Sequence, residues 1–396
     1  MTLALVFLAL LLLSVAGYTV AVLALERTRG ASRRVLLPRG VPPPISIVKP
    51  LSGLDDELET NLESFFALDY PDYEVIFSFA RRDDPAFAVA RQVADRHPAV
   101  ASVFVVDGRE PGGNAKVNRL VAGLRHARYG HLLMADGNVR VDRDFLRRAM
   151  ARMSGPRVGL VSHLFVARGA RTLGSRLESL HLNGALRAGT AAVAGVFKMP
   201  CVVGKSILVS RRALIAIGGL ETLRDHLAED YLLGQAVSGA GYGVVLSGDE
   251  IATTEISRGL TEVWKRQRRW AILRKRLGGL SYGSELLASP LPWFCGAVAL
   301  SAGHSGLAAI ALAVYAARIA LEGFSARSAG LPFTPLDVAL CPLRDLAVAA
   351  LFWAGLFGRR TAWRGRSLRV GRRTLIARLE RTPAVPRNFG QIAEQN

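Results

Sequence analysis

Apolar stretches lie at both ends of the chain, and a middle region of short alternating patterns separates them. Residues 3–25 carry no charge. They are long enough to cross a bilayer core of about 30 Å, so we expect a membrane span there. Three further apolar stretches follow the middle region, at 286–302, 305–321 and 336–357. The first two are short and meet at a Gly-His-Ser turn, which leaves open a hairpin, a re-entrant pair or one long tilted span.

The middle of the chain predicts an α/β domain. Seven short β-like runs occur at 45–48, 74–79, 103–106, 131–135, 158–166, 203–209 and 242–246. Helix-patterned segments separate most of them, at 56–67, 85–96, 114–127, 142–153 and 228–239. Strands that alternate with such helices predict a mainly parallel sheet with helices on both faces. Ligands of these sheets bind beyond the carboxyl ends of the strands.

Composition narrows the class of protein. The 396 residues are 50% hydrophobic with a formal charge of +19, which is too apolar for an ordinary soluble enzyme. The basic residues lie beside apolar stretches and no nucleic-acid-binding motif occurs, so we do not expect a nucleic-acid partner. Cys201, Cys295 and Cys341 lie far apart. They form no CxxC pair, and therefore indicate neither a zinc site nor a disulfide framework.

Charge around the apolar stretches predicts the orientation in the membrane. Arginines from Arg27 to Arg39 follow the first stretch, so the positive-inside rule places residue 26 onward in the cytoplasm. No basic region precedes this stretch and the stretch is long, which favours a retained anchor over a cleaved signal peptide. Ten arginines between Arg359 and Arg387 place the tail in the cytoplasm too, and an even number of crossings must follow the middle region.

These patterns divide the chain into six parts. We expect an anchor, a basic and proline-rich linker, a catalytic domain, an amphipathic interface helix, membrane helices and an arginine-rich cytoplasmic tail. Their bounds are 1–25, 26–44, 45–258, 259–284, 285–357 and 358–396.

Two acidic sites follow predicted strands. Asp136 ends the 131–135 run, where a carboxylate can hold Mg²⁺ or Mn²⁺ against substrate phosphates. The alternative is that Asp136 caps the next turn. Asp84 follows the 74–79 run and could bind a base or ribose, or it could cap the helix that Pro85 opens.

Two helix starts could contact a substrate. A glycine turn at 112–113 leads into a helix that carries Lys116 and Asn118, and such a start can bind anions. A plain loop with a surface lysine is the alternative. Glu229 and Asp230 begin another helix, where acidic residues are ordinary partners of the helix dipole. Asp230 could instead be a general base that takes a proton from an acceptor hydroxyl.

A basic and aromatic segment precedes the later apolar stretches. It holds Arg266, Arg269 and Trp270 among several other basic residues. A basic amphipathic helix on anionic lipid explains most of these charges. Arg269 could grip a diphosphate in a bidentate manner, and Trp270 could form a wall of an acceptor pocket.

Taken in order, these residues resemble the ceramide glucosyltransferase family, membrane-bound relatives of the inverting GT-A glycosyltransferases. The resemblance runs from about residue 45 to residue 276. It includes the opening run at 46–53, the segments at 61–66 and 69–75, three aspartates and a closing (Q/R)xxRW pattern. Asp84, Asp136 and Asp230 stand at the three aspartates, and Arg266, Arg269 and Trp270 match the closing pattern.

The resemblance implies a GT-A-like catalytic domain with membrane helices. Asp84 and Asp136 would serve UDP-sugar and divalent-metal binding, and Asp230 would be the base. Lys116, Asn118, Cys201 and Glu229 would join the substrate site. The enzyme would transfer a sugar, usually glucose, with inversion to ceramide, working from the cytoplasmic side of a bacterial inner membrane. Asn138 departs from the common D-x-D form, because it replaces a second carboxylate.

Three other functions stay open. Related bacterial enzymes glycosylate hopanoid lipids with similar motifs, so the acceptor could be a hopanoid or another lipid. A processive polysaccharide synthase would need more membrane crossings and a glutamine at the start of the closing pattern. A non-catalytic membrane scaffold would be a decayed transferase, against which Asp84, Asp136, Asp230 and Trp270 argue.

Overall fold

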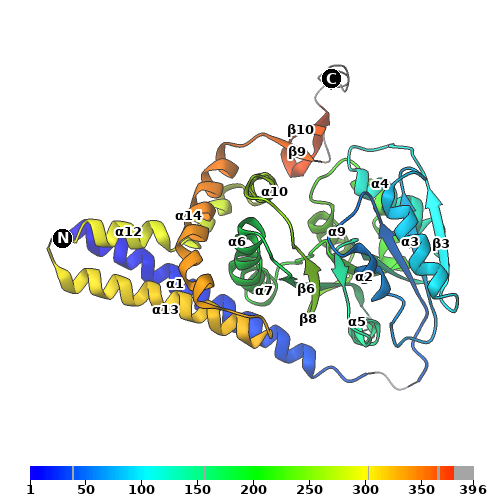
Figure 1. The fold of residues 1–396 in the computed structure, drawn as a ribbon, viewed down its shortest axis with the longest axis horizontal. Coiled ribbons are helices and arrows are strands. Elements are labelled where there is room, and N and C mark those ends of the chain that lie inside the picture. The colour runs from blue at the N-terminus through cyan, green and yellow to red at the C-terminus, as the bar shows by residue number, and fades with distance from the viewer. Residues whose placement is uncertain (38–39, 156, 302, 364–365, 379–396) are drawn as a thin grey trace, which may run out of the picture.

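The protein has an α/β domain at one end and a group of apolar helices at the other (Figure 1). This computed structural model describes residues 1–37, 40–155, 157–301, 303–363 and 366–378. Both parts were expected from the sequence pattern.

Eight strands form the main sheet, in the order β3-β2-β1-β4-β7-β6-β8-β5. They are β1 (Ile45–Pro50), β2 (Tyr73–Phe79), β3 (Ala101–Val106), β4 (His131–Ala135), β5 (Val139–Arg140), β6 (Val158–Arg168), β7 (Ser206–Ser210) and β8 (Gly243–Thr254). The first four of that order are parallel to one another, whereas β7 runs antiparallel to β4 and β6. The α/β fold class is confirmed, and β5 and β7 make the sheet mixed.

Helices cover both faces of the sheet because its central strands are apolar on both sides. On one face α2 (Leu58–Glu63), α3 (Pro85–Arg96) and α5 (Phe145–Met153) pack over residues such as Ile47 and Phe77. On the other, α4 (Ala115–Leu124), α8 (Arg211–Ala216) and α9 (Glu229–Gly239) pack over residues such as Val48 and Ile76. The carboxyl ends of β1 and β4 therefore remain uncovered for a site.

A third group of helices joins the α/β domain to the apolar helices. It consists of α6 (Leu173–His181), a π-helical turn at Leu182–Leu186 and α7 (Arg187–Gly195). Ala188, Ala191 and Ala192 of α7 pack against Ala21 and Leu25 of α1 (Thr2–Arg33).

The first helix extends eight residues beyond the apolar run, into the segment expected to be a linker. Arg29 explains this extension. Its guanidinium is buried and donates to Glu26 at 2.9 Å and to the Ser328 hydroxyl at 2.7 Å. These bonds fix the last turns of α1 against the rest of the protein.

The later apolar stretches form α12 (Leu291–Ala299), α13 (Ser305–Ser328) and α14 (Pro335–Phe357). By length and composition alone, α1, α13 and α14 could each cross a membrane. Among the alternatives left open, the structure forms a hairpin: α12 and α13 pack side by side with the first half of α1, through Leu11, Ala297 and Ala311. Figure 1 shows α14 running across the direction of these three helices.

The basic segment forms α10 (Leu260–Gly278), which leads through a 3-10 turn at Gly279–Gly283 into α11 (Ser284–Leu287). The arginine-rich tail was expected from the sequence without any folded element of its own being identified. It instead forms an antiparallel sheet of β9 (Arg360–Trp363), β10 (Arg366–Val370) and β11 (Ile376–Arg378). Residues 379–396, including Arg387, lie outside the described residues.

Candidate active site

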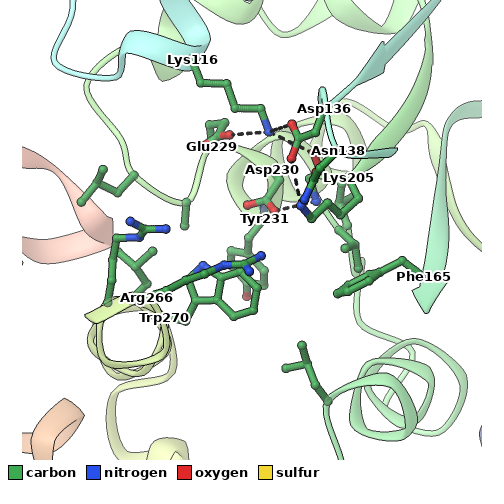
Figure 2. Close-up of a pocket in the computed structure, with 18 of the residues that line it drawn as sticks. Lys116, Asp136, Asn138, Phe165, Lys205, Glu229, Asp230, Tyr231, Arg266 and Trp270 are labelled. Carbon is green, nitrogen blue, oxygen red and sulfur yellow. Dashed lines mark hydrogen bonds and ion pairs between the residues drawn. The ribbon is translucent and has the colours of Figure 1, made fainter. Parts of the chain in front are cut away.

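A cavity of about 680 Å³ lies between the sheet and α10 (Figure 2). Its walls come from the carboxyl end of β4, the start of α9, the segment before β7 and one side of α10. Eight of the residues that the sequence singled out line it: Lys116, Asp136, Cys201, Glu229, Asp230, Arg266, Arg269 and Trp270. The position at the strand ends is the one expected for this class of sheet.

Asp136 lies between two lysine side chains. Its Oδ1 is 2.8 Å from Lys116 Nζ, and its Oδ2 is 3.4 Å from Lys205 Nζ. Lys49, buried beneath, donates to the Asp136 backbone carbonyl at 3.0 Å. Burial raises the pKa of the Asp136 carboxyl, but Lys116 and Lys205 outweigh it and lower this pKa to about 2. Asp136 is therefore ionised at every physiological pH.

These residues do not fit a preformed site for the divalent metal that the resemblance implies. Asp136 contributes one carboxylate, and each of its oxygens faces an ammonium group. The Asn138 side-chain oxygen accepts a hydrogen bond from Lys205 Nζ at 2.8 Å. No group of three His, Cys, Asp or Glu side chains within the described ranges could hold a metal ion. The donor set here suits an anion beside the lysines better than a cation.

Glu229 and Asp230 enter the cavity from the first turn of α9. Lys116 Nζ lies 3.5 Å from Glu229 Oε1, and Asn114 donates to Glu229 Oε2 at 3.0 Å. Burial raises the pKa of the Glu229 carboxyl, and Lys116 lowers it by a smaller amount. Lys116 is thus shared by two carboxylates, Asp136 and Glu229.

The Asp230 carboxylate is held by two backbone amides. Gly204 N–H donates to Oδ2 and Tyr231 N–H donates to Oδ1, each at 2.8 Å. A Cβ atom at position 204 would lie 2.7 Å from Oδ2, so only glycine allows this approach. Burial raises the pKa of Asp230 above its ordinary value, which moves the carboxyl toward the range of a useful general base.

Arg266 and Trp270 face the carboxylates from α10, on the opposite side of the cavity (Figure 2). The Arg266 guanidinium lies 4.7 Å from the centre of the Trp270 ring, a cation–π distance. Arg266 also donates to Glu255 at 2.9 Å and to Glu178 at 3.2 Å. Because both of these carboxylates are fully buried, Arg266 fixes α10 to the domain and is not free to swing toward a ligand.

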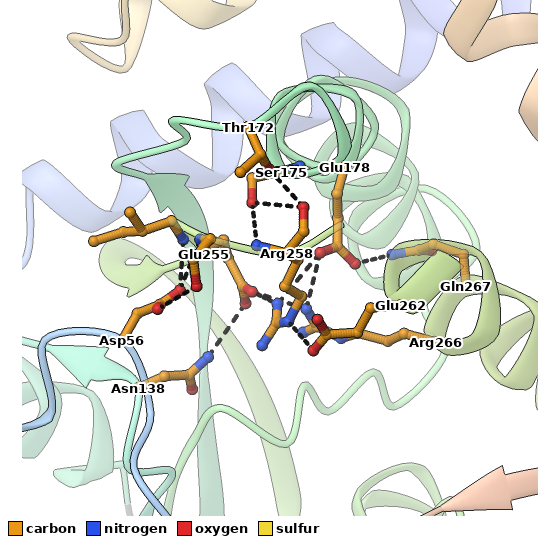
Figure 3. Close-up of polar contacts among 12 residues, drawn as sticks. Asp56, Asn138, Thr172, Ser175, Glu178, Glu255, Arg258, Glu262, Arg266 and Gln267 are labelled. Atoms are coloured by element: carbon orange, nitrogen blue, oxygen red, sulfur yellow. Dashed lines mark hydrogen bonds and ion pairs between the residues drawn. The ribbon is translucent and has the colours of Figure 1, made fainter. Parts of the chain in front are cut away.

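Glu178 is the centre of the polar network that holds α10 (Figure 3). It accepts from Gln267 Nε2 at 2.7 Å and lies 3.3 Å from Arg258. Asn138 extends this network toward the cavity, since its amide nitrogen donates to Glu255 at 3.2 Å. Asn138 thus links Lys205 to the α10 network, because its side-chain amide accepts from Lys205 and donates to Glu255. A carboxylate at this position could accept from Lys205 but could not donate to Glu255.

Two of the expected substrate residues lie outside the cavity lining. Asp84 caps α3 by accepting from Ala86 N–H at 3.0 Å, and the same oxygen accepts from Gly53 N–H at 2.9 Å. Asn118 donates to the Gly112 carbonyl at 2.8 Å and so holds the glycine turn. The anion site expected at the start of that helix is occupied, because Asn114 accepts the Lys116 and Val117 amide hydrogens.

Several residues in or near the cavity were not found from the sequence. Lys205 and Asp55 line it, and Lys49 supports Asp136 from below. Ala362 of the tail sheet also contributes to the wall. Burial of Lys49 lowers its pKa to about 7, and burial of Lys205 lowers its pKa to about 8. The sequence indicates Lys49 and Lys205 only by their positions, because Lys49 lies inside an apolar strand and Lys205 lies directly before one.

Two curated relatives support the resemblance stated from the sequence. Ceramide glucosyltransferase 1 of Caenorhabditis elegans is 29% identical over 233 residues, 59% of this chain and 50% of that protein. Ceramide glucosyltransferase of Komagataella phaffii is 30% identical over 207 residues, 46% of this chain and 40% of that protein. The chain spans about half the length of the curated relatives it matches, or less.

The solved structures give a weaker likeness. A mannosyltransferase from Pyrobaculum calidifontis, in complex with GDP-Man and Mn²⁺, is 20% identical and aligns over 88% of this chain and 99% of its own, with a TM-score of 0.49. The family model is decisive: it matches residues 6–376, and the chain therefore belongs to Glycosyl transferase family 21.

Proposed function

We propose that this protein is a membrane-bound glycosyltransferase that transfers glucose, with inversion, from UDP-glucose to the primary hydroxyl of ceramide. The observation that carries the proposal is the convergence of Lys116, Asp136, Asp230 and Trp270 on one cavity. Family membership and the ceramide glucosyltransferase relatives support the reaction class. The apolar helices support a location in a membrane. We place it in a bacterial inner membrane with the α/β domain in the cytoplasm, because arginines follow the first apolar stretch.

The two lysines beside Asp136 would hold the diphosphate of the donor. Asp136 balances their charge at 2.8 and 3.4 Å. An incoming diphosphate would share these ammonium groups and gain charge-assisted hydrogen bonds. Arg269, on the facing wall, would meet the same group. As the sugar–phosphate bond breaks, these cations would stabilise the negative charge that develops on UDP.

Asp230 would serve as the general base. It would accept the proton of the acceptor hydroxyl while that oxygen bonds to the anomeric carbon and UDP leaves with the electron pair of the broken bond. The two amide hydrogen bonds fix the direction of the carboxylate, and its raised pKa suits proton transfer near neutral pH.

The remaining residues of the site would act around these groups. Trp270, Cys201 and Phe165 also line the cavity, and the first carbons of a lipid acceptor would lie against such side chains. Glu229 would position Lys116 through their 3.5 Å contact. Asp84 and Asn118 would serve the donor indirectly, by fixing the turns at Gly53 and Gly112.

Purified full-length protein in vesicles, given radiolabelled UDP-glucose and ceramide, tests the proposal. We expect label in the lipid phase. Label in a hopanoid but not in ceramide would change the acceptor, label in a polymer would indicate a polysaccharide synthase, and no transfer or hydrolysis of any sugar nucleotide would indicate a scaffold. The same assay in EDTA and with Mn²⁺ measures the dependence on a divalent ion directly.

A further inference from the structure

One face of α14 is apolar and exposed along its whole length. The exposed stripe is Leu336, Ala339, Leu343, Leu346, Ala350, Trp353 and Phe357. The spacing of three and four residues places these side chains on one side of a helix. The structure describes every residue of α14, and no exposed residue of this helix carries a charge. Leu346 is 58% exposed and Phe357 is 75% exposed, so the part of the chain that the structure describes does not cover the stripe.

The opposite face of α14 is bonded to the α/β domain from its first turn. Arg176 of α6 donates to Asp337 at 2.8 Å and to Thr334 at 2.7 Å. In the middle of the helix, buried Arg344 donates to the Leu180 carbonyl of α6 at 3.2 Å.

The carboxyl end of α14 is attached to α10 and to the 3-10 turn that follows it. Tyr282 donates to the Phe352 carbonyl at 3.1 Å, and a Cβ at Gly355 would lie 2.8 Å from Ala271 of α10. Immediately after the helix, Arg268 of α10 donates to the Arg360 carbonyl at 3.1 Å. A helix of 23 residues is roughly 34 Å long. Over that length α14 follows α6 and then the strongly basic α10.

The path of the chain gives the same result. The hairpin of α12 and α13 leads away from the domain and returns to it. Ala311, near the amino end of α13, packs with Leu11 of α1. Near the carboxyl end of α13, Arg187 of α7 donates to the Ser325 carbonyl at 2.8 Å and to the Ser325 hydroxyl at 3.0 Å. The tail sheet after α14 bonds to the segment before α9, with Ile376 N–H donating to the Asp225 carbonyl at 2.8 Å. Both ends of α14 therefore lie on the side of the catalytic domain.

We propose that α14 does not cross the membrane but lies in the plane of its cytoplasmic surface, with the exposed stripe inserted among lipid chains. Its hydropathy alone would make it a span. The exposed stripe contacts bilayer lipid, because α1 and the α12–α13 hairpin provide membrane segments next to it. The stripe also has no polar residue that a soluble partner would recognise. In this arrangement the bilayer holds α14, and α14 holds α10 with Arg269 and Trp270 at the membrane surface. The inference rests on the proposed membrane location.

Cysteine labelling tests the topology. In full-length protein carrying Cys201→Ala, Cys295→Ala and Cys341→Ala, single cysteines would be placed at exposed positions before and after α14, Arg327→Cys and Arg359→Cys. Asp95→Cys marks the catalytic domain. In sealed vesicles with that domain outward, we expect a membrane-impermeant maleimide to label all three. Protection of Arg359→Cys until detergent is added, with Arg327→Cys labelled, would overturn the proposal.

Depth measurement tests the insertion independently of transfer activity. Nitroxide labels at Leu336, Leu343, Leu346 and Trp353, each introduced through cysteine, would be compared for access to oxygen and to a water-soluble nickel complex. An in-plane helix gives one shallow depth at all four sites. A depth that is greatest in the middle and falls at both ends indicates a crossing helix. Water access at every site indicates a stripe outside lipid, and either of these two results contradicts the proposal.

Discussion

At the scale of single residues, the site depends on charges that compensate one another. Asp136 and Asp230 could be found in the sequence because one ends an apolar strand and the other begins a helix. Lys205 and Lys49 could not, since their partners come from distant parts of the chain. Asp84 gave two readings, and the structure places its carboxylate at the cap of α3. The local sequence pattern therefore identifies candidate carboxylates, whereas the lysines that pair with them can be found only once the fold is known.

Replacement of the base gives the sharpest kinetic result. We expect Asp230→Asn to retain UDP binding, because the amide keeps the shape of the side chain, and to lose transfer by roughly 10²–10⁴-fold. Calorimetry for UDP and single-turnover transfer measure the two effects. Asp95→Asn, a change to an exposed carboxylate far from the cavity, is the control. Turnover of Asp230→Asn within a few fold of the parent would exclude the role.

The pH dependence follows from the raised pKa of the same group. A base works only when deprotonated, so transfer should fall as pH decreases through the pKa of Asp230, which burial places above 3.8. Lys116 lowers the pKa values of both Asp230 and Glu229. In Lys116→Met the acidic limb should therefore move to higher pH. A limb that stays in place, measured on kcat with saturating donor, would show that Asp230 does not set it.

Asp84 allows a comparison of two side chains. Asparagine caps a helix as well as aspartate does, whereas alanine does not. We expect Asp84→Ala to lower the free energy of unfolding by about 1 kcal/mol and to weaken UDP binding through the loosened Gly53 turn, and Asp84→Asn to restore both. Loss of UDP affinity in Asp84→Asn with normal thermal stability would instead indicate direct contact between this carboxylate and the nucleotide.

At the scale of elements, α10 is positioned by buried ions more than by its own pattern. Its sequence indicated a basic amphipathic helix, and the residues that fix it could not be read from that pattern. Glu178 comes from α6 and Glu255 follows β8, and both reach Arg266. Most strands and helices were predictable because their apolar periodicity is strong. The hairpin of α12 and α13 was one of three alternatives, since nine residues are too few for hydropathy to decide.

Glu178 is therefore expected to be more important than its lack of any motif suggests. Removing one partner of a buried ion pair costs about 3–5 kcal/mol, and Glu178→Gln leaves Arg258 and Arg266 with less negative charge. We expect a clear decrease in thermal stability and slower transfer. Glu262→Gln removes a carboxylate that is 65% exposed and lies 3.5 Å from the same Arg258, so its effect should be within experimental error. Equal effects of the two substitutions would contradict this account.

At the scale of the whole molecule, segments far apart in the sequence form one wall of the cavity. Thr374 accepts from Leu227 N–H at 3.1 Å through its carbonyl, and Ile376 packs with Leu227 and Ile272. The sequence offered no signal for this contact because the tail strands are three to five residues long and rich in arginine. The arginines of the tail indicated on which side of the membrane the tail lies, and they gave no indication that the tail forms the β9–β11 sheet.

Neighbouring tail residues provide a matched pair. Ile376 is buried and Leu375 is 48% exposed. We expect Ile376→Asp to place a charge against Leu227 and Ile272, at a cost of about 2 kcal/mol or more, and to reduce transfer. Leu375→Asp should leave both stability and transfer unchanged. Normal transfer by Ile376→Asp in vesicles would mean that the tail sheet does not support the cavity.

The docking of the tail sheet has a practical consequence for anyone who wishes to produce a soluble fragment. A piece cut at the end of the α/β domain would lack α10, Ala362 and the β9–β11 sheet, and with them one wall of the chamber in which donor and acceptor must meet. Such a fragment would keep its sheet and its carboxylates yet expose Leu227 and Ala228 to solvent. A workable excision must keep α10 and splice residues 359–378 back beside it.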